Sequence, residues 1–323
     1  MRARDWLVLG TLSLLWGGSF PLMRVAAPEL GAFLLISLRV LIAALFLVAY
    51  NATRGALIPP GKAWPALLVV GVGNAALPFV LFAEALRHVP TTLAAPLNAT
   101  TPIFSALAAA LWLGERLTGR TVLGLGLGIA GVALLAGFGP IPINPTVVAA
   151  AAACLVAAAL YGWAAVYTRR RLAAVPSQAT ATYTQVFAAL VLAPFAAVTL
   201  PDRLPPRPVI AAVVVLGLLC TGVAFLLYFH LIRQVGPVQT TTVTYLAPAA
   251  GMVLGAVFLG DPLNASTAAG FGLVLASAIL INQRAPTARP DPAAAHPVVP
   301  GATPTRAAAT NPGAGAAPGA GGE

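Results

Sequence analysis

Long apolar runs are the feature of this sequence that most constrains its fold. They recur along nearly all of its 323 residues, and each is roughly 20 residues long, enough to cross ~30 Å of hydrocarbon as a helix. A helix also satisfies its own backbone polar groups inside lipid. Only 8% of the residues are charged, against roughly a quarter in a soluble domain. The sequence therefore predicts an all-α integral membrane protein.

The apolar runs predict ten transmembrane helices. The first run follows Met1-Arg2-Ala3-Arg4, as in a cleaved signal peptide, but its length and the further spans favour a retained helix. The predicted spans are residues 6–24, 30–50, 64–86, 91–113, 120–138, 147–167, 178–200, 208–231, 237–259 and 265–282.

The formal charge of +10 reports topology rather than a nucleic-acid partner, because the basic residues are scattered through short loops. Lys and Arg are enriched on the cytoplasmic side of membrane proteins. With the N-terminus inside, that side holds most of them, including the cluster Arg169-Arg170-Arg171, while Arg24 and Arg87 lie opposite. Both termini are predicted to be cytoplasmic, in a multi-pass protein of the bacterial cytoplasmic membrane.

Neither a metal nor a cofactor is expected. Cys154 and Cys220 fall within predicted helices, without metal-binding or disulfide spacing. Residues 285–323 are rich in Ala, Pro and Gly without apolar periodicity, which predicts a disordered tail.

The sequence contains an internal duplication. Residues 98–134 align without gaps to residues 244–280 at a constant offset of 146, with Pro102 on Pro248 and Glu115 on Asp261. With the offset relaxed by one, Trp16-Gly17 aligns with Tyr161-Gly162, and Arg24 with Arg169. The predicted repeats are residues 1–140 and 141–284. Because each holds an odd number of spans, the second must be inverted relative to the first, as in many secondary transporters.

The motifs of both repeats carry a family resemblance. They are Leu15-Trp16-Gly17-Gly18-Ser19-Phe20, Leu38-Arg39, Leu97 to Pro102 running to Leu113-Gly114-Glu115-Arg116-Leu117, Tyr245 to Pro248, and Leu259 to Leu263. The chain resembles a ten-helix permease of the EamA family in the drug/metabolite transporter superfamily, over about residues 5 to 282. Asp261 departs conservatively from the more usual Glu. The resemblance implies a carrier of small metabolites, often an exporter of amino acids or related compounds, that does not hydrolyse ATP.

Arg39 and Gln185 occupy matching positions of the two repeats and are candidates for the repeat interface. A charge near the middle of a span costs at least ~2.5 to 3.5 kcal/mol, so Arg39 must face protein or water. It is expected either to line a cavity and bind a carboxylate or to act as a structural clamp, and the presence of an Arg here across the family favours the clamp. Gln185 contacts substrate or joins helices by hydrogen bonds.

Glu84 and His230 also match at the offset of 146. Either could couple transport to protons, because a titratable group within the membrane is needed for that. Both lie close to helix ends, where a snorkelling or capping role is the alternative.

Polar and proline residues inside the spans are candidates for a cavity or for hinges. Pro102 and Pro248 each free a backbone carbonyl, which predicts gating hinges or static kinks satisfied by nearby hydroxyls. Asn74, Asn98 and Thr101 place polar groups beside these positions.

Aromatic residues well inside spans suit a cavity for amphipathic solutes, with core packing as the alternative for each. The cavity candidates are Trp16, Phe20, Tyr161, Trp163 and Tyr245.

Small residues predict a close helix contact between the fifth and tenth spans. Gly124, Gly126, Gly128 and Gly131 would meet Gly270, Gly272 and Ser277, joining the two halves or, alternatively, forming a homodimer. Glu115 and Asp261 are assigned to helix ends.

The expected function is secondary transport, exporting small metabolites such as amino acids or amphiphilic drugs by alternating access. The expected partners are a small-molecule substrate and the lipid bilayer. An importer or a flippase for lipid-linked metabolites is the alternative within transport. An enzyme is not expected, because the sequence has no nucleophile elbow, metal-spaced cluster or paired intramembrane carboxylates.

Overall fold

The computed structural model describes residues 1–137, 144–201 and 203–282, and within these ranges every regular element is helical. The all-α prediction is confirmed for this part of the chain. Seven helices there are long and apolar enough to cross a membrane, and two further apolar helices are shorter, Gly119–Leu135 and Val243–Leu259. The seven are Ala3–Thr53, Gly61–Ala85, Thr91–Leu113, Pro145–Arg171, Ser177–Ala197, Arg207–Val235 and Ala265–Asn282.

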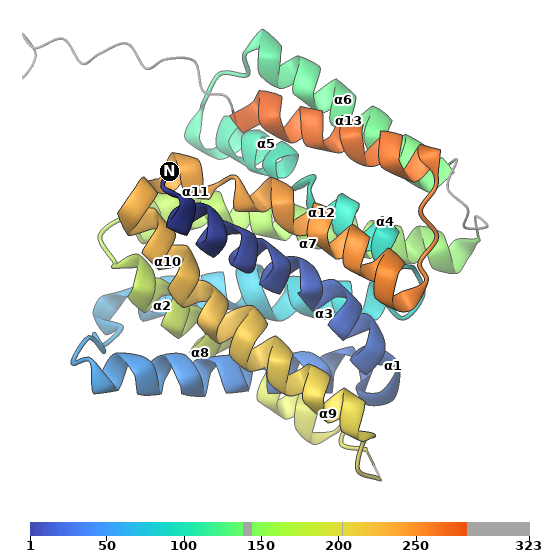
Figure 1. The fold of residues 1–323 in the computed structure, drawn as a ribbon. Coiled ribbons are helices and arrows are strands. Elements are labelled where there is room, and N and C mark those ends of the chain that lie inside the picture. Colours follow the sequence, from blue (N-terminus) through green and yellow to red (C-terminus); the bar gives the residue numbers. More distant parts are fainter. Residues whose placement is uncertain (138–143, 202, 283–323) are drawn as a thin grey trace, which may run out of the picture. The chain divides into compact units, whose positions relative to one another are not determined.

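Helix α1 (Ala3–Thr53) contains both of the first two predicted spans. The predicted break between residues 24 and 30 is wrong, because the helix continues through Pro28 and leaves helical geometry only at Gly31, with φ 72° and ψ 159°. A residue without Cβ adopts this positive φ without strain. Figure 1 shows the resulting two legs, residues 3–30 and 32–53, running in different directions.

Two spans contain a segment of π-helix, whose turns are wider than those of an α-helix. The third span consists of α2 (Trp64–Gly71), η2 (Val72–Ala76) and α3 (Leu77–Ala85), after the short η1 (Gly61–Ala63). The eighth consists of α9 (Arg207–Val214), η3 (Val215–Val223) and α10 (Ala224–Val235). At the offset of 146, residues 72–76 fall on residues 218–222, so the wide turns occupy matching places.

The other helices follow the predicted spans with local differences. The fourth span is divided at Ala99-Thr100 and the ninth at Thr241-Thr242. Helix α7, which corresponds to the sixth predicted span, extends through Arg171, four residues beyond the predicted end, because cations are favourable at a helix C-terminus. These elements are α4 (Thr91–Asn98), α5 (Thr101–Leu113), α6 (Gly119–Gly137), α7 (Pro145–Arg171), α8 (Ser177–Ala197), α11 (Pro237–Thr240), α12 (Val243–Leu259) and α13 (Ala265–Asn282).

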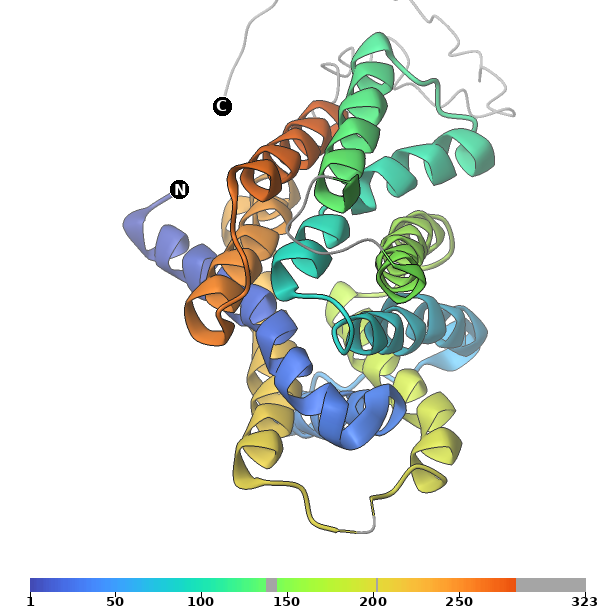
Figure 2. The same ribbon diagram turned by 90° about the vertical axis from the view of Figure 1, so that its right-hand side faces the viewer.

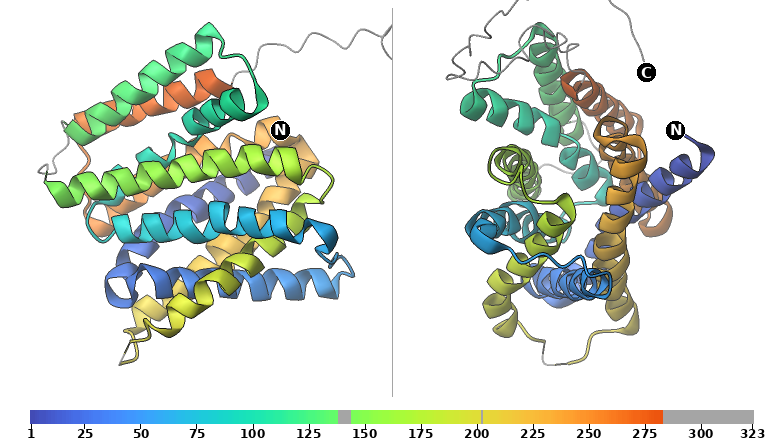
Figure 3. Two further views of the ribbon diagram at one scale, coloured as in Figure 1. Left: turned by 180° about the vertical axis from the view of Figure 1, so that it is seen from behind. Right: turned by 90° about the vertical axis from the view of Figure 1, so that its left-hand side faces the viewer.

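Helices from the two halves of the sequence are interleaved. Helix α1 packs against α12, α8 and η3, and α6 lies along α13 (Figures 1 and 2). Seen from behind, α7 lies between α3 and α5, and it contacts both (Figure 3). The predicted boundary at residues 140 and 141 and the predicted tail at 285–323 lie outside the described residues.

Glycines permit backbone contact at two pairs of matching positions. A Cβ at Gly17 would lie 2.4 Å from the carbonyl oxygen of Ala247 in α12, and one at Gly162 would lie 2.5 Å from the backbone nitrogen of Ser105 in α5. Likewise, Gly71 meets residues 184–188 of α8, and Gly217 meets residues 39–42 of α1. Among the contacted positions, Phe104 and Ser105 correspond to Ala250 and Gly251, and Ile42 corresponds to Ala188, at the offset of 146.

The predicted contact between the fifth and tenth spans is confirmed as packing within the chain. A Cβ at Gly131 would lie 2.8 Å from the carbonyl oxygen of Gly270, and one at Gly128 would lie 2.8 Å from Oγ of Ser277. Small residues thus bring α6 against α13. The prediction is wrong for Gly126 and Gly272, because a Cβ at either would have no neighbour within 4 Å.

Candidate functional site

Arg39 lies in the second leg of α1 and is buried, with 3% of the residue exposed. Its Nε donates a hydrogen bond to Oγ1 of Thr221 in η3 at 3.0 Å, and Nη1 lies 3.3 Å from the sulfur of Met23. The guanidinium carbon is 3.9 Å from the centroid of the Phe79 ring, a cation–π contact. No carboxylate among the described residues forms an ion pair with Arg39.

The wide turn of η3 positions the hydroxyl that Arg39 contacts. Thr221 donates its own hydroxyl hydrogen to the carbonyl oxygen of Leu216, five residues earlier, at 2.8 Å. That oxygen atom is thereby oriented as an acceptor toward the guanidinium. The sequence reasoning missed Thr221, Met23 and Phe79, although the offset of 146 already paired the segments that form η2 and η3.

Aromatic rings connect Arg39 to two of the predicted cavity residues. Tyr161 packs against Phe79 at 6.3 Å and against Phe82 at 6.2 Å between ring centroids, and Phe20 meets Phe82 edge-on at 5.5 Å. We call this group the arginine–aromatic cluster: Arg39, Phe79, Phe82, Tyr161 and Phe20. It joins α1, α3 and α7.

Two predicted amide residues carry oxygen atoms without a donor. Gln185 is 1% exposed, and its Oε1 has no hydrogen-bond partner among the described residues. Oδ1 of Asn98 is in the same state. A buried acceptor without a partner costs about 1 to 3 kcal/mol, so each position favours a bound water or a polar ligand group. Asn74 lies in η2, one residue beyond Gly73.

Three of the predicted cavity residues lie away from the arginine–aromatic cluster. Trp16 packs on Phe225 and Tyr228 of α10, and Trp163 stacks with Trp112. The hydroxyl of Tyr245 donates to the carbonyl oxygen of Ala278 at 3.3 Å and accepts from Asn282 at 2.7 Å.

The two prolines occupy different helical positions. Pro102 lies in the first turn of α5, immediately after the division of the fourth span, whereas Pro248 lies inside α12. The carbonyl oxygen of Asn98, four residues before Pro102, accepts the hydroxyl of Thr101 at 2.7 Å. At Pro102, a neighbouring hydroxyl therefore satisfies the freed carbonyl.

Glu84 lies at the end of α3 in an exposed group of charges. Its carboxylate pairs with Arg87 at 2.9 Å and with His88 at 3.3 Å, and 44% of its side chain is exposed. Glu84 and His88 border a cavity of about 430 Å³ against the start of α7. His230, its counterpart, lies in α10.

Two ion pairs occupy matching positions but differ in burial. At the first, which we call the Asp261 end, the carboxylate pairs with Arg24 and also accepts the backbone N–H of Thr91 at 2.6 Å, and the Asp261 side chain is 1% exposed. At the second, the Glu115 end, Arg169 and Glu115 pair at 2.5 Å, with side chains 42% and 54% exposed. The helix-end assignment missed the long-range contact of Asp261.

Helix packing differs at these two ends in the same sense. At the Asp261 end, α4 packs on α12, and a Cβ at Gly255 would lie 2.7 Å from Cβ of Thr91. The residue matching Gly255 is Ala109, and the residue matching Thr91 is Pro237, which has no backbone N–H. Within the described ranges, α5 has no comparable packing against α11 or α12.

A helical chain with several apolar spans and a buried arginine without a carboxylate partner among the described residues is typical of a multi-pass membrane protein. The profile of the EamA-like transporter family matches residues 6–137 and again residues 148–283. The chain therefore belongs to the EamA-like transporter family, and the family resemblance of its motifs is confirmed. Membership implies a small-molecule substrate and a bilayer as its surroundings.

Similar proteins extend along most of the chain. An uncharacterized transporter of Bacillus subtilis, YvbV, is 27% identical over 88% of this chain and 93% of its own. A probable terminal-alkyne amino-acid exporter of Streptantibioticus cattleyicolor is 28% identical over 83% of this chain and 90% of its own. YedA, an uncharacterized inner membrane transporter of Escherichia coli, is 26% identical over 87% of this chain and 92% of its own. A solved protein crystal structure superposes with a TM-score of 0.61 and 25% identity, covering 87% of this chain and 96% of that one.

Proposed function

We propose that this protein is a secondary transporter that exports small organic solutes, such as amino acids or amphiphilic compounds, across the bacterial cytoplasmic membrane. Membership of the EamA-like transporter family supports transport. Similarity to a probable terminal-alkyne amino-acid exporter supports both the substrate class and the direction.

The transporter is built from two inverted repeats of five spans, with both termini in the cytoplasm. Counting the two legs of α1 separately gives ten spans with α6 and α12 included. The observation that carries the proposal is the recurrence of the same helix contact in both halves: Gly17 lies on α12, and its counterpart Gly162 lies on α5. Equivalent contacts in two halves that begin on opposite sides permit exchange of conformation about a pseudo-two-fold axis.

The unequal ends correspond to one state of an alternating-access cycle. The Asp261 end is closed by a buried ion pair, a backbone hydrogen bond and the packing of α4 on α12. The Glu115 end has an exposed ion pair and lacks the equivalent packing among the described helices. With the charge bias placing Arg169 inside, the state is closed toward the periplasm and open toward the cytoplasm.

Arg39 has both a conformational and an electrostatic role in this mechanism. It ties α1 to η3 and α3 through Thr221 and Phe79, so its contacts change when these helices move. Its charge has no carboxylate partner, and it attracts the carboxylate of a solute. The unpaired oxygens of Gln185 and Asn98 suit a solute ammonium group.

Pro102 and Pro248 serve as hinges, and the boundary residues Glu84 and His230 serve as sites of proton coupling. Their positions in α5, α12, α3 and α10 permit these roles. A static kink at Pro102 and a capping role for Glu84 are the alternatives, because a hydroxyl satisfies the freed carbonyl and the carboxylate lies in exposed ion pairs. Proton-coupled export responds to an imposed pH gradient, and uncoupled export does not. If Glu84 or His230 couples export to protons, its replacement by Gln should remove this response.

The test uses everted membrane vesicles, in which an exporter concentrates solute in the lumen. We expect uptake of at least one amino acid or cationic amphiphile, abolished by Arg39→Ala and retained by Arg54→Ala. Arg54 is a suitable control because it also stacks on an aromatic ring, Tyr50, at 5.3 Å, but at the exposed end of α1. Uptake in right-side-out vesicles alone would indicate an importer, and transbilayer movement of a lipid-linked solute alone would indicate a flippase.

A further inference from the structure

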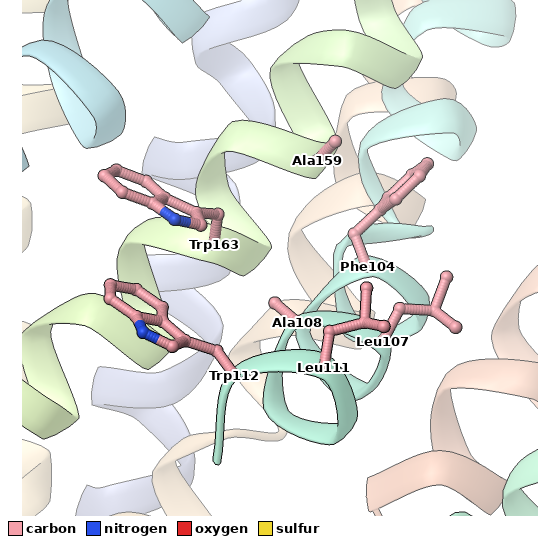
Figure 4. Close-up of a pocket in the computed structure, with 7 residues that line it drawn as sticks. All are labelled: Phe104, Leu107, Ala108, Leu111, Trp112, Ala159 and Trp163. Atoms are coloured by element: carbon pink, nitrogen blue, oxygen red, sulfur yellow. The ribbon is translucent and has the colours of Figure 1, made fainter. Parts of the chain in front are cut away.

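An apolar groove of about 560 Å³ runs between α5 and α7 (Figure 4). Its lining is aliphatic and aromatic, and indole nitrogens are its only polar side-chain atoms. Leu111 on its rim is 89% exposed, so the groove opens away from the interior of the helix bundle. The lining residues are Phe104, Leu107, Ala108, Leu111, Trp112, Ala159 and Trp163.

Aromatic rings gather at the end of the groove where both helices terminate. Trp112 and Trp163 stack with ring centroids 6.1 Å apart and an interplanar angle of 4°, and Tyr167 lies 5.1 Å from Trp163. Trp112 is the penultimate residue of α5, and Tyr167 is one turn from the end of α7. Tryptophan and tyrosine favour the headgroup level of a bilayer, so this end of the groove lies at a membrane surface.

Positive charge surrounds the same end. Arg170 donates to the carbonyl oxygen of Trp112 at 3.3 Å, and its guanidinium lies 5.1 Å from the ring centroid of that residue. Arg171 and Arg116 are exposed and have no ion-pair partner in the described part of the chain. The single carboxylate nearby, Glu115, is already paired with Arg169.

The groove is particular to one half of the chain. The matching positions in α12 and α1 place Leu254 where α5 has Ala108 and Gly18 where α7 has Trp163. There, Cδ1 of Leu254 would lie 3.6 Å from a Cβ at Gly18, in ordinary van der Waals contact. The place of the arginine triplet is taken by Arg24-Val25-Ala26. The space and the charge are therefore present together in one half and absent together from the other.

We propose that this groove binds an anionic phospholipid, with an acyl chain along α5 and α7 and the headgroup phosphate at Arg170 and Arg171. Charge complementarity favours this occupant: apart from two indole N–H donors the lining offers a polar solute no hydrogen-bond partner, and the exposed arginines place positive charge at the groove's end. The inference needs only a membrane location and does not depend on the transported solute.

Quenching of tryptophan fluorescence by brominated lipids tests the proposal. The full chain, with Trp6, Trp16 and Trp64 replaced by Phe, is placed in phosphatidylcholine vesicles containing brominated phosphatidylglycerol or an equal fraction of brominated phosphatidylcholine. We expect stronger quenching by the brominated phosphatidylglycerol. Removal of two arginine contacts by Arg170→Gln with Arg171→Gln should weaken its apparent affinity by roughly thirtyfold.

Two further variants separate the groove from general charge effects. Arg203→Gln with Arg207→Gln removes two exposed arginines elsewhere and should leave quenching unchanged. Ala108→Leu fills the groove as Leu254 fills its counterpart, and it should abolish the preference while every arginine remains. If the triple Phe background does not fold, the arginine-dependent part of the quenching is measured in the protein with all five tryptophans.

Three results would overturn the proposal. Equal quenching by both brominated lipids would show that the headgroup is not selected, and full quenching in Ala108→Leu would show that the acyl chain lies elsewhere. Protection of Trp112 and Trp163 from both lipids, together with crosslinking between chains, would show that a second copy covers the groove.

Discussion

Replacement of Asp261 by Asn should open the Asp261 end. The carboxylate is 1% exposed, pairs with Arg24 and accepts the Thr91 N–H at 2.6 Å. Hydrogen bonds to a charged group contribute about 1.5 to 3 kcal/mol. Because Asn keeps the shape but removes the charge, the closed state should lose about that much relative to the open one. Since ~1.4 kcal/mol is tenfold, the population of the open state should rise between about tenfold and a hundredfold.

The assay is the labelling rate of a cysteine introduced at Thr92, a residue in α4 that is 2% exposed. Cys154 and Cys220 are first replaced by Ala, and a membrane-impermeant maleimide is added to intact cells. When the end opens and closes faster than the thiol reacts, the labelling rate is proportional to the open population. The rate should therefore increase by the same factor in Asp261→Asn.

Two matched variants define the cause. Glu115→Gln breaks the exposed counterpart pair, which is worth about 0.2 to 1 kcal/mol, and should not increase labelling at Thr92. Thr91→Pro removes the backbone N–H that Asp261 accepts, together with a hydroxyl that has no hydrogen-bond partner among the described residues, and proline is tolerated in the first helical turn. It reproduces the residue found at Pro237 and should raise labelling at least about tenfold, because one hydrogen bond to a charged group contributes at least ~1.5 kcal/mol. Equal effects of Asp261→Asn and Glu115→Gln, or no effect of Asp261→Asn, would refute the reasoning.

Three other predictions concern the helix contacts and the cluster. Gly17→Ala should destabilise the protein by about 1 to 3 kcal/mol, since its Cβ would lie 2.4 Å from a carbonyl oxygen, whereas Gly18→Ala meets its nearest atom at 3.6 Å and should melt as wild type in detergent. Arg39→Lys should lower the export rate at least tenfold, because an ammonium cannot bond Thr221 and stack on Phe79 together. A normal export rate in this variant would show that transport is independent of these contacts. Pro248→Ala should reach the membrane in normal amount but lose export; unaltered export would remove the hinge from the mechanism.

The apolar runs were sufficient to predict the helices but not their interruptions. Length and hydropathy located α4 with α5 and α13 at the predicted bounds. They placed the first break too early, because hydropathy carries no signal for the positive φ of Gly31, which provides the turn. The wide turns of η2 and η3 have no signal in hydropathy, since an extra residue in a turn changes neither length nor polarity appreciably.

The candidate site was predicted in part. The cost of a buried charge identified Arg39, and the structure places Phe20 and Tyr161 in the same cluster. Helical periodicity alone does not assign a ring to one cavity. The sequence therefore grouped Trp163 and Tyr245 with Phe20 and Tyr161, although they lie elsewhere. The contact of Asp261 joins residues 237 positions apart, and its burial depends on tertiary packing that no local pattern encodes.

The backbone contact at Gly17 has a mechanical consequence. Main-chain atoms touch there, so α1 and α12 cannot approach further, and any movement of one against the other must pivot on this point. Arg24 lies seven residues away, a lever arm of roughly 10 Å along the helix. A tilt of about 10° about Gly17 displaces the backbone at Arg24 by about 2 Å, enough to break a hydrogen bond whose usual length is about 3 Å. A rotation too small to disturb the helices themselves is thus sufficient to release the ion pair at their end.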